Sequence, residues 1–168
     1  MPEWGMPAPC PALLRAAEPG DLPAIVALIH ELAAFEQLSH LVETTEAGLA
    51  PHLFGERPVA EAVVAEVAGQ VVAFALCFTN FSTFRCRPGL YLEDLYVQPA
   101  HRGQGIGQAL LRHLAGVALA RGCGRFEWSV LDWNAPAIAL YEKLGAQVLP
   151  EWRICRVGRE QLEAMARG

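Results

Sequence analysis

The most constraining feature of this sequence is a glycine-rich turn between an apolar strand and an amphipathic helix. The turn spans Arg102 to Gly107 and reads R-G-Q-G-I-G, and the helix predicted after it runs from about Gly105 to Arg121. Glycines at alternate positions allow a tight turn that directs several backbone N–H groups to one point at the helix N-terminus. Unpaired N–H groups and the helix dipole bind phosphate there. The pattern therefore predicts an α/β protein that holds a phosphate-bearing ligand.

Two common phosphate-binding motifs do not match this turn. A P-loop requires a Lys-Ser or Lys-Thr pair after its last glycine, and the chain contains neither pair. A dinucleotide fingerprint requires G-x-G-x-x-G, but counting from Gly103 places Gln108 at the third glycine position. The remaining interpretations are a different nucleotide-binding turn and an ordinary glycine-rich turn without a ligand.

The remaining chain alternates strands and helices. Apolar and β-branched runs predict strands over Leu13–Ala16, Glu61–Ala68, Val71–Thr79, Leu90–Val97, Arg125–Leu131 and about Glu151–Val157. Gly69-Gln70 is predicted to form a hairpin turn, and Asn80–Gly89 a loop. Further helices are predicted after Asp21 as N-cap, from about Thr44 to Leu53, from Asn134 to Gly145, and at the C-terminus. Strands before and after single helices predict a mixed α/β sheet with helices on both faces.

The composition excludes several classes of protein. Apolar and aromatic residues make up 53% of the chain, which disfavours disorder, and the longest apolar run, Val71–Phe78, is far shorter than a membrane span. A formal charge of −5 without a basic run disfavours a nucleic-acid partner. The five cysteines form no C-x-x-C pair, so we predict neither a metal nor a disulfide. With no signal peptide in view, we expect a cytoplasmic protein with a loose extension over residues 1–10 and a single domain over residues 11–168.

Two adjacent carboxylates, Glu93 and Asp94, interrupt the apolar strand before the glycine turn. Successive side chains of a strand point to opposite faces, so in a strand buried on both sides at least one carboxylate is desolvated. Burial of a charge without a partner is costly, which indicates a functional role. The alternatives are an edge strand whose acids stay in water and a structural ion pair.

A third segment follows the last central strand. Asn134 is a good N-cap and Gly145 a good residue after a helix end, so this helix is well delimited. Tyr141 lies seven residues after Asn134, which is two helical turns and therefore the same face. On its own Tyr141 is also compatible with a core aromatic residue.

Together these three segments resemble the GNAT superfamily of N-acetyltransferases, in particular its diamine (spermidine/spermine) acetyltransferase-like branch. The resemblance runs from about Leu14 to Val157. It implies a mixed, mostly antiparallel sheet of about seven strands, splayed at an acetyl-CoA site and covered by helices on both faces. It also implies direct acetyl transfer from acetyl-CoA to a primary amine of a small cationic substrate (a diamine, polyamine or lysine-like amine), in a homodimer. As the composition also indicates, we expect no metal, nucleic acid or membrane partner.

The resemblance assigns roles to individual residues. Glu93 would be the general base and Tyr141 the general acid. The amine side would be lined by Glu36, Asp94, Phe35, Phe84 and Trp152. The cofactor would contact Leu95, Tyr96, Val97, Arg102, Gly103, Gln104, Gly105, Ile106, Gly107, Asn134, Ala137, Tyr141 and Lys143.

Two departures from that branch concern specificity for polyamines and leave the acetyl transfer itself unaffected. Phe35 stands where the polyamine enzymes carry a tyrosine. The loop before the Leu-Glu-Asp strand lacks their tryptophan and instead adds Arg85 and Arg87. The alternative functions are a peptide or protein N-acetyltransferase and a non-catalytic acyl-CoA-binding module.

Overall fold

The computed structural model describes residues 10–168, so the extension expected over residues 1–10 lies outside the described residues except for Cys10. The chain forms two compact units, the first ending at Ser129 and the second running from Val130 to Gly168. The single domain expected over residues 11–168 stays a prediction.

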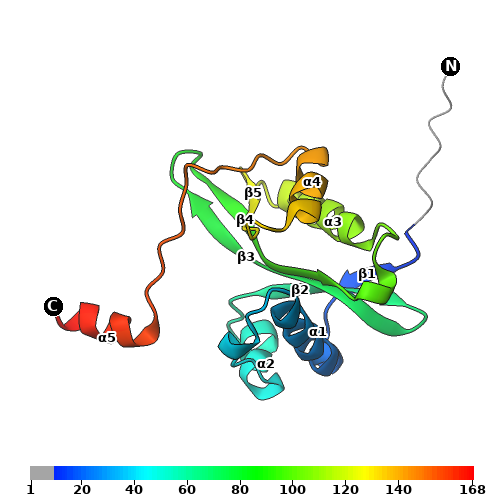
Figure 1. The fold of residues 1–168 in the computed structure, drawn as a ribbon, viewed down its shortest axis with the longest axis horizontal. Coiled ribbons are helices and arrows are strands. Elements are labelled where there is room, and N and C mark those ends of the chain that lie inside the picture. Colours follow the sequence, from blue (N-terminus) through cyan, green and yellow to red (C-terminus); the bar gives the residue numbers. More distant parts are fainter. Residues whose placement is uncertain (1–9) are drawn as a thin grey trace. The chain divides into compact units, whose positions relative to one another are not determined.

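The first unit is built on one mixed sheet in which the strands follow one another in chain order (Figure 1). Neighbouring strands are antiparallel except the last pair, which is parallel. The strands are β1 (Leu13–Ala16), β2 (Glu61–Val67), β3 (Gln70–Ser82), β4 (Arg87–Val97) and β5 (Phe126–Trp128). The expected mixed, mostly antiparallel α/β sheet is confirmed, although the part of the chain that the structure describes forms five strands instead of about seven.

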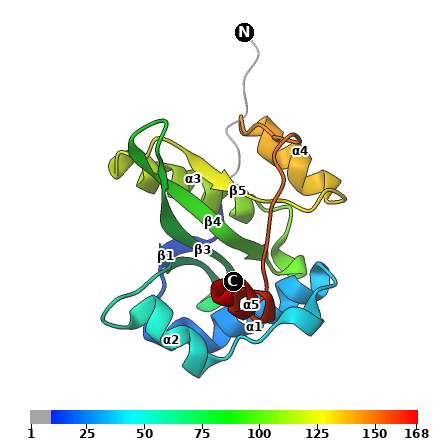
Figure 2. The ribbon, with the colours of Figure 1, turned by 90° about the vertical axis from the view of Figure 1, so that its left-hand side faces the viewer.

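Helices cover both faces of this sheet (Figures 1 and 2). One face carries α1 (Leu22–Phe35) and α2 (Glu46–Phe54), and the other carries α3 (Ile106–Ala120). Three short 3-10 helices, η1 (Pro19–Asp21), η2 (Ser39–Leu41) and η3 (Pro99–His101), lie in the connections.

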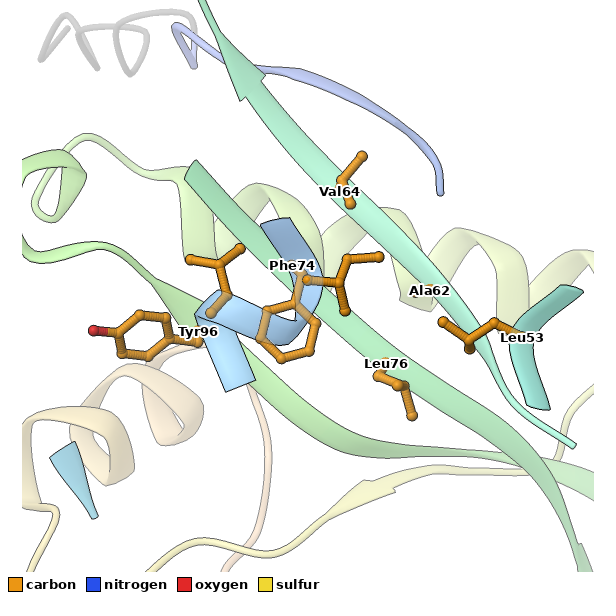
Figure 3. Close-up of a cluster of buried hydrophobic side chains, with 8 residues drawn as sticks. Leu53, Ala62, Val64, Phe74, Leu76 and Tyr96 are labelled. Atoms are coloured by element: carbon orange, nitrogen blue, oxygen red, sulfur yellow. The ribbon is translucent and has the colours of Figure 1, made fainter. Parts of the chain in front are cut away.

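The core between α1, α2 and the sheet follows from strand alternation (Figure 3). Val64 and Phe74 lie on this face of β2 and β3 and are fully buried against Ile25 of α1. Tyr96 of β4 closes the cluster, and its hydroxyl points away from the other core side chains (Figure 3). The opposite face packs under the apolar stripe of α3, where Leu110 and Leu114 are buried.

Several details of the first unit differ from the expectations. The β2–β3 turn is Ala68-Gly69, one residue earlier than expected, and both residues have left-handed φ values of 51° and 79°. The expected loop over Asn80–Gly89 is instead a long hairpin, because β3 and β4 stay paired as far as Ser82 and Arg87. The expected strand Arg125–Leu131 is confirmed only over Phe126–Trp128.

The second unit contains two helices, α4 (Ala135–Lys143) and α5 (Arg159–Arg167). Both were expected. The strand predicted near Glu151–Val157 is wrong, because this segment has no regular secondary structure. Its apolar side chains Trp152, Ile154 and Val157 are exposed. β-propensity alone does not form a strand without a neighbour to pair with.

Among the described residues, no helix is both long enough and apolar enough to span a membrane.

Candidate functional site

A β-bulge in β4 places the two adjacent carboxylates. Leu76 pairs with Asp94 and Cys77 pairs with Leu92, so Glu93 is the extra residue of the pair. Bulges bend a strand and redirect side chains, and they occur often beside active sites. The result is that Glu93 is exposed, whereas Asp94 is half-buried on the sheet face that packs against α1.

The pairing of β4 changes at the same point. β5 pairs with β4 only as far as Leu92, opposite Trp128, whereas β3 continues to pair as far as Val97. From Glu93 to Val97, β4 therefore has a strand partner on one edge only within residues 10–129. This opening of the sheet contains Leu95, Tyr96 and Val97, the positions expected to contact the cofactor.

Three carboxylates lie close enough at this opening for their charges to interact: Glu36, Glu93 and Asp94, here called the acidic cluster. Burial, with the negative charges of Glu93 and Glu36, raises the pKa of Asp94 to about 6. Burial also raises the pKa of Glu36, which follows the last residue of α1. Across residues 10–168, none of the three forms a salt bridge. A cluster of this kind attracts a cation and can accept a proton near neutral pH.

The glycine turn leads directly into α3. Gly103 and Gly105 have left-handed φ values of 73° and 81°, and a Cβ added at either position would meet no atom within 4 Å. The first hydrogen bond of α3 runs from the Ala109 N–H to the Gly105 carbonyl, so the N–H groups of Ile106 and Gly107 have no intrahelical acceptor. The turn thus has the open backbone donors that a pyrophosphate requires.

The side chain of Arg102 does not point into this turn. Its guanidinium carbon lies 5.0 Å from the centre of the Phe35 ring and 5.2 Å from that of Tyr96. Its Nε donates a hydrogen bond of 2.9 Å to the Val97 carbonyl. The structure therefore brings Arg102, expected on the cofactor side, together with Phe35, expected on the amine side.

Two residues beside this contact were missed by the sequence analysis. Gln98 donates a hydrogen bond of 3.0 Å from Nε2 to Oε1 of Glu31 in α1. Burial and the charge of Glu31 raise the pKa of the Tyr96 phenol, against the opposing effect of Arg102. No motif marks Glu31 or Gln98, because their proximity depends on how α1 packs on the sheet.

Helix α4 and its N-cap carry the predicted cofactor-binding residues of the second unit. The Asn134 side chain accepts a hydrogen bond of 3.4 Å from the Ala137 N–H, which confirms Asn134 as the N-cap. Tyr141 lies two turns further along the same helix, Lys143 is its last residue, and Gly145 adopts a left-handed φ of 94° beyond it.

Two other candidate residues lie outside the strands and helices. Phe84 lies at the tip of the β3–β4 hairpin and is 100% exposed. It is separated from Asp94 by the paired strands between Arg87 and Asp94, which span roughly 20 Å at the usual rise per residue. Trp152 belongs to the irregular segment of the second unit. The structure does not bring Phe84 to the acidic cluster.

A surface pocket of about 410 Å³ lies elsewhere in the first unit. It is lined by the segment before α2 and by α2 itself, including Glu43, Thr45 and His52, and by none of the predicted site residues.

Comparison with known proteins identifies the class. Residues 26–146 match the model of the acetyltransferase (GNAT) family. The matched range contains the bulge, the glycine turn and α4. The chain therefore belongs to the GNAT family, and it is an N-acetyltransferase. Enzymes of this family use acetyl-CoA.

Individual proteins of known activity or known structure are similar to this chain over most of its length. A thialysine N-epsilon-acetyltransferase from Bos taurus is 40% identical, and the alignment covers 92% of this chain and 96% of the relative. An L-ornithine N5-acetyltransferase from Arabidopsis thaliana is 34% identical, with 90% and 86% covered. Among solved structures, an integron cassette protein from V. cholerae superposes with a TM-score of 0.78 at 25% identity, covering 94% of this chain and 99% of that one.

Proposed function

We propose that this enzyme transfers an acetyl group from acetyl-CoA directly to a primary amine of a small cationic substrate, in a ternary complex of enzyme, cofactor and amine. The observation that carries the proposal is the acidic cluster beside the opening of β4, where three carboxylates have no cationic partner within residues 10–168. A cationic substrate supplies the missing charge.

The glycine turn and the β4 opening are proposed to hold the cofactor. The backbone N–H groups from Gly103 to Gly107 would bind the pyrophosphate. Leu95 and Val97 would offer backbone groups to the pantetheine arm where β4 lacks a second strand partner. Asn134 and Ala137 of α4 are proposed to contact the same arm, and Lys143 the more distant part of the cofactor.

The chemistry requires the substrate ammonium to lose a proton before attack. An alkyl amine has a pKa near 10.4, so only about one molecule in two thousand is neutral at pH 7. Glu93, exposed on the bulge, is proposed to accept this proton. The nitrogen then attacks the thioester carbon, a C–N bond forms, the C–S bond breaks, and the nitrogen releases its second proton to solvent to give the neutral amide. Tyr141 is proposed to protonate the departing thiolate, since the two groups have comparable proton affinities.

Alignment contributes more to the rate than proton transfer. Effective molarities can supply about 7–11 kcal/mol, whereas an acid–base effect of 10²–10⁴-fold corresponds to about 3–5 kcal/mol. The two parts of the proposed site have separate tasks, because the acidic cluster holds the amine and the glycine turn holds the cofactor.

The names of the relatives support an amino acid or diamine with a side-chain amine as the substrate class. Thialysine and ornithine each carry such an amine. Phe35 and Glu36, at the end of α1, are proposed to contact the substrate together with Asp94. For a peptide or protein to be the substrate, one amine of that polypeptide would have to reach the acidic cluster.

We also propose a cytoplasmic homodimer without nucleic acid or membrane partners. The exposed apolar segment around Trp152, Ile154 and Val157 supports a self-association surface. Light scattering at micromolar protein should give the mass of a dimer. A monomer mass independent of concentration would contradict this part of the proposal.

A thiol-release screen with acetyl-CoA tests the function. We expect turnover with ornithine, lysine-like amino acids or diamines, and little turnover with neutral amines. Peptides accepted in preference to free amines would favour a peptide acetyltransferase. CoA binding without release of thiol for any amine would favour a binding module.

The cofactor site has its own matched pair of variants. Gly105→Asp places a side chain and a negative charge on the proposed pyrophosphate site. Gly122→Asp makes the same change beyond the other end of α3, where φ is also left-handed at 68° and the Cβ meets no atom within 4 Å. We expect Gly105→Asp alone to abolish CoA binding in calorimetry, with equal loss of stability in both variants. Equal CoA affinity of the two would contradict the assignment.

A further inference from the structure

The glycine turn is held at its two ends by different contacts. At its C-terminal end Ile106 is buried, with 1% of its surface exposed, in the core under α3. At its N-terminal end Arg102 is exposed, and its backbone N–H donates only a local hydrogen bond of 3.3 Å to the Pro99 carbonyl of η3. The Arg102 side chain connects this end to α1 and β4, through the Phe35 and Tyr96 rings and the Val97 carbonyl.

The residues between the two anchors are intrinsically flexible. Gly103 and Gly105 have left-handed φ values, and glycine populates many other backbone conformations at little cost. A turn of this kind binds phosphate well only if its N–H groups already converge, since ordering it on binding lowers the affinity. The contacts of Arg102 supply part of that order before the ligand arrives.

We propose that Arg102 is a positioning residue that pre-organises the glycine turn through its contacts with Phe35 and Tyr96. Phe35 is the last residue of α1 and Glu36 of the acidic cluster follows it. A side chain on the amine side of the enzyme therefore sets the affinity for the cofactor. The inference rests on the proposed function, because it takes the turn to be the pyrophosphate site.

The contact also connects the two substrates. If Phe35 favours cofactor binding through Arg102, bound cofactor must favour the position of Phe35 by the same factor. The end of α1, and with it Glu36, is then better ordered when the cofactor is present. CoA should therefore tighten the binding of the amine.

An arginine that only bound the phosphate would behave differently. Its guanidinium would contribute through its charge, and that contribution would not depend on an aromatic ring in α1. Here the guanidinium faces that ring at 5.0 Å, which is the distance of a cation–π contact.

The experiment measures the dissociation constant of CoA by calorimetry, which requires no turnover. The variants are Phe35→Leu, Arg102→Lys and the double variant, with thermal unfolding to show that each is folded. Two variants serve as controls. Phe35→Tyr keeps the ring, and Phe81→Leu makes the same change at an exposed phenylalanine of β3 whose register partner is Pro88, at the other end of β4.

We expect Phe35→Leu and Arg102→Lys each to weaken CoA binding by about 3–10-fold, as loss of a cation–π contact implies. The double variant should be no weaker than the worse single variant, and the two controls should stay within about twofold of wild type.

A second measurement separates positioning from chemistry. Phe35→Leu should raise the KM for the amine and reduce the tightening of amine binding by CoA, with kcat largely unchanged. CoA affinity that is unchanged or increased in Phe35→Leu would overturn the inference and leave Arg102 as a plain phosphate ligand. Fully additive losses in the double variant would overturn it too. Absence of CoA binding in the wild type would instead contradict the proposed function itself.

Discussion

Asp21 and Asp94 are both withdrawn from water in the first unit, yet their surroundings are opposite. Asp21 is 8% exposed and accepts hydrogen bonds of 2.7 and 2.9 Å from Arg15. Its other contact is the Glu18 N–H at 2.8 Å. The Arg15 guanidinium lowers the pKa of Asp21, whereas burial and two neighbouring acids raise the pKa of Asp94 to about 6.

The difference separates a structural acid from a functional one. Arg15 also contacts Glu66, so one guanidinium connects β1, β2 and the turn before α1. Its charge is already paired within the folded protein. The acidic cluster has no such cation within residues 10–168. A buried charge without a partner costs stability, and its presence indicates that a bound ligand completes it.

The largest expected effect comes from Glu93→Gln, which keeps the shape of the side chain but removes the base. We expect kcat/KM to fall about 10²–10³-fold, most at low pH where free amine is scarce, with little change in stability. Steady-state kinetics from pH 6 to 9 test this. A larger loss in Asp94→Asn than in Glu93→Gln would instead identify Asp94 as the base.

Removing the cation that pairs with the structural acid Asp21 should lower the stability of the fold and leave activity unchanged. Arg15→Met leaves Asp21 and Glu66 without their cation, and we expect a loss of about 2 kcal/mol, below the value for a fully buried pair because Arg15 is partly exposed. Urea unfolding at pH 7 measures it. Because the pKa of Asp21 is lowered on folding, its contribution is present above about pH 4 and is lost as the pH falls through the lower folded value. A wild-type stability of Arg15→Met would show that the ion pair contributes nothing.

The sequence predicted the structural elements better than the contacts between them. Strand and helix periodicity placed β4, α3 and α4 within a few residues, because alternation and caps are local signals. The strand near Glu151–Val157 was wrong, since strand formation depends on a neighbour that no local pattern specifies. Of the six strand ranges predicted, this is the one that the structure lacks within residues 10–168.

The site was predictable in its residue types and less so in its geometry. That one of the two adjacent acids is desolvated followed from strand alternation, and it is Asp94. Which acid it is depends on the bulge at Glu93, and this depends on the register with β3. The contact of Arg102 with Phe35 could not be predicted, because it joins residues far apart in the chain through a side-chain conformation.

The pH dependence of stability sharpens the comparison further. The pKa of Asp94 is raised on folding, from 3.8 to about 6, so the native state binds its proton more tightly than the unfolded state does. The contribution of protonated Asp94 to stability is present at low pH and is lost as the pH rises through about 6, which is the opposite of the pH dependence of Asp21. Asp94→Asn should therefore match wild type below about pH 4 and exceed its stability by about 1–2 kcal/mol above pH 7, a value reduced for partial exposure. Equal stability at both pH values would show that the buried carboxyl has found a partner.

The smallest expected effect concerns Glu36, at the edge of the acidic cluster. Its pKa is raised by burial, and its charge acts on Asp94, so it belongs to the field that the amine meets. We assign Glu36 attraction of the amine alone, because the base is proposed to be Glu93. Glu36→Gln should raise the KM for the amine about 3–5-fold, more for a substrate with two positive charges than for one, with kcat and CoA affinity unchanged.

The matched control for the loss of one negative charge is Glu56→Gln, because Glu56 is an exposed acid beyond α2. Because screening weakens attraction between partly exposed charges, the difference between the two variants should shrink as salt increases from 0.05 to about 0.5 M. An equal rise in KM for both variants would mean that the net charge of the protein, and not the acidic cluster, attracts the substrate.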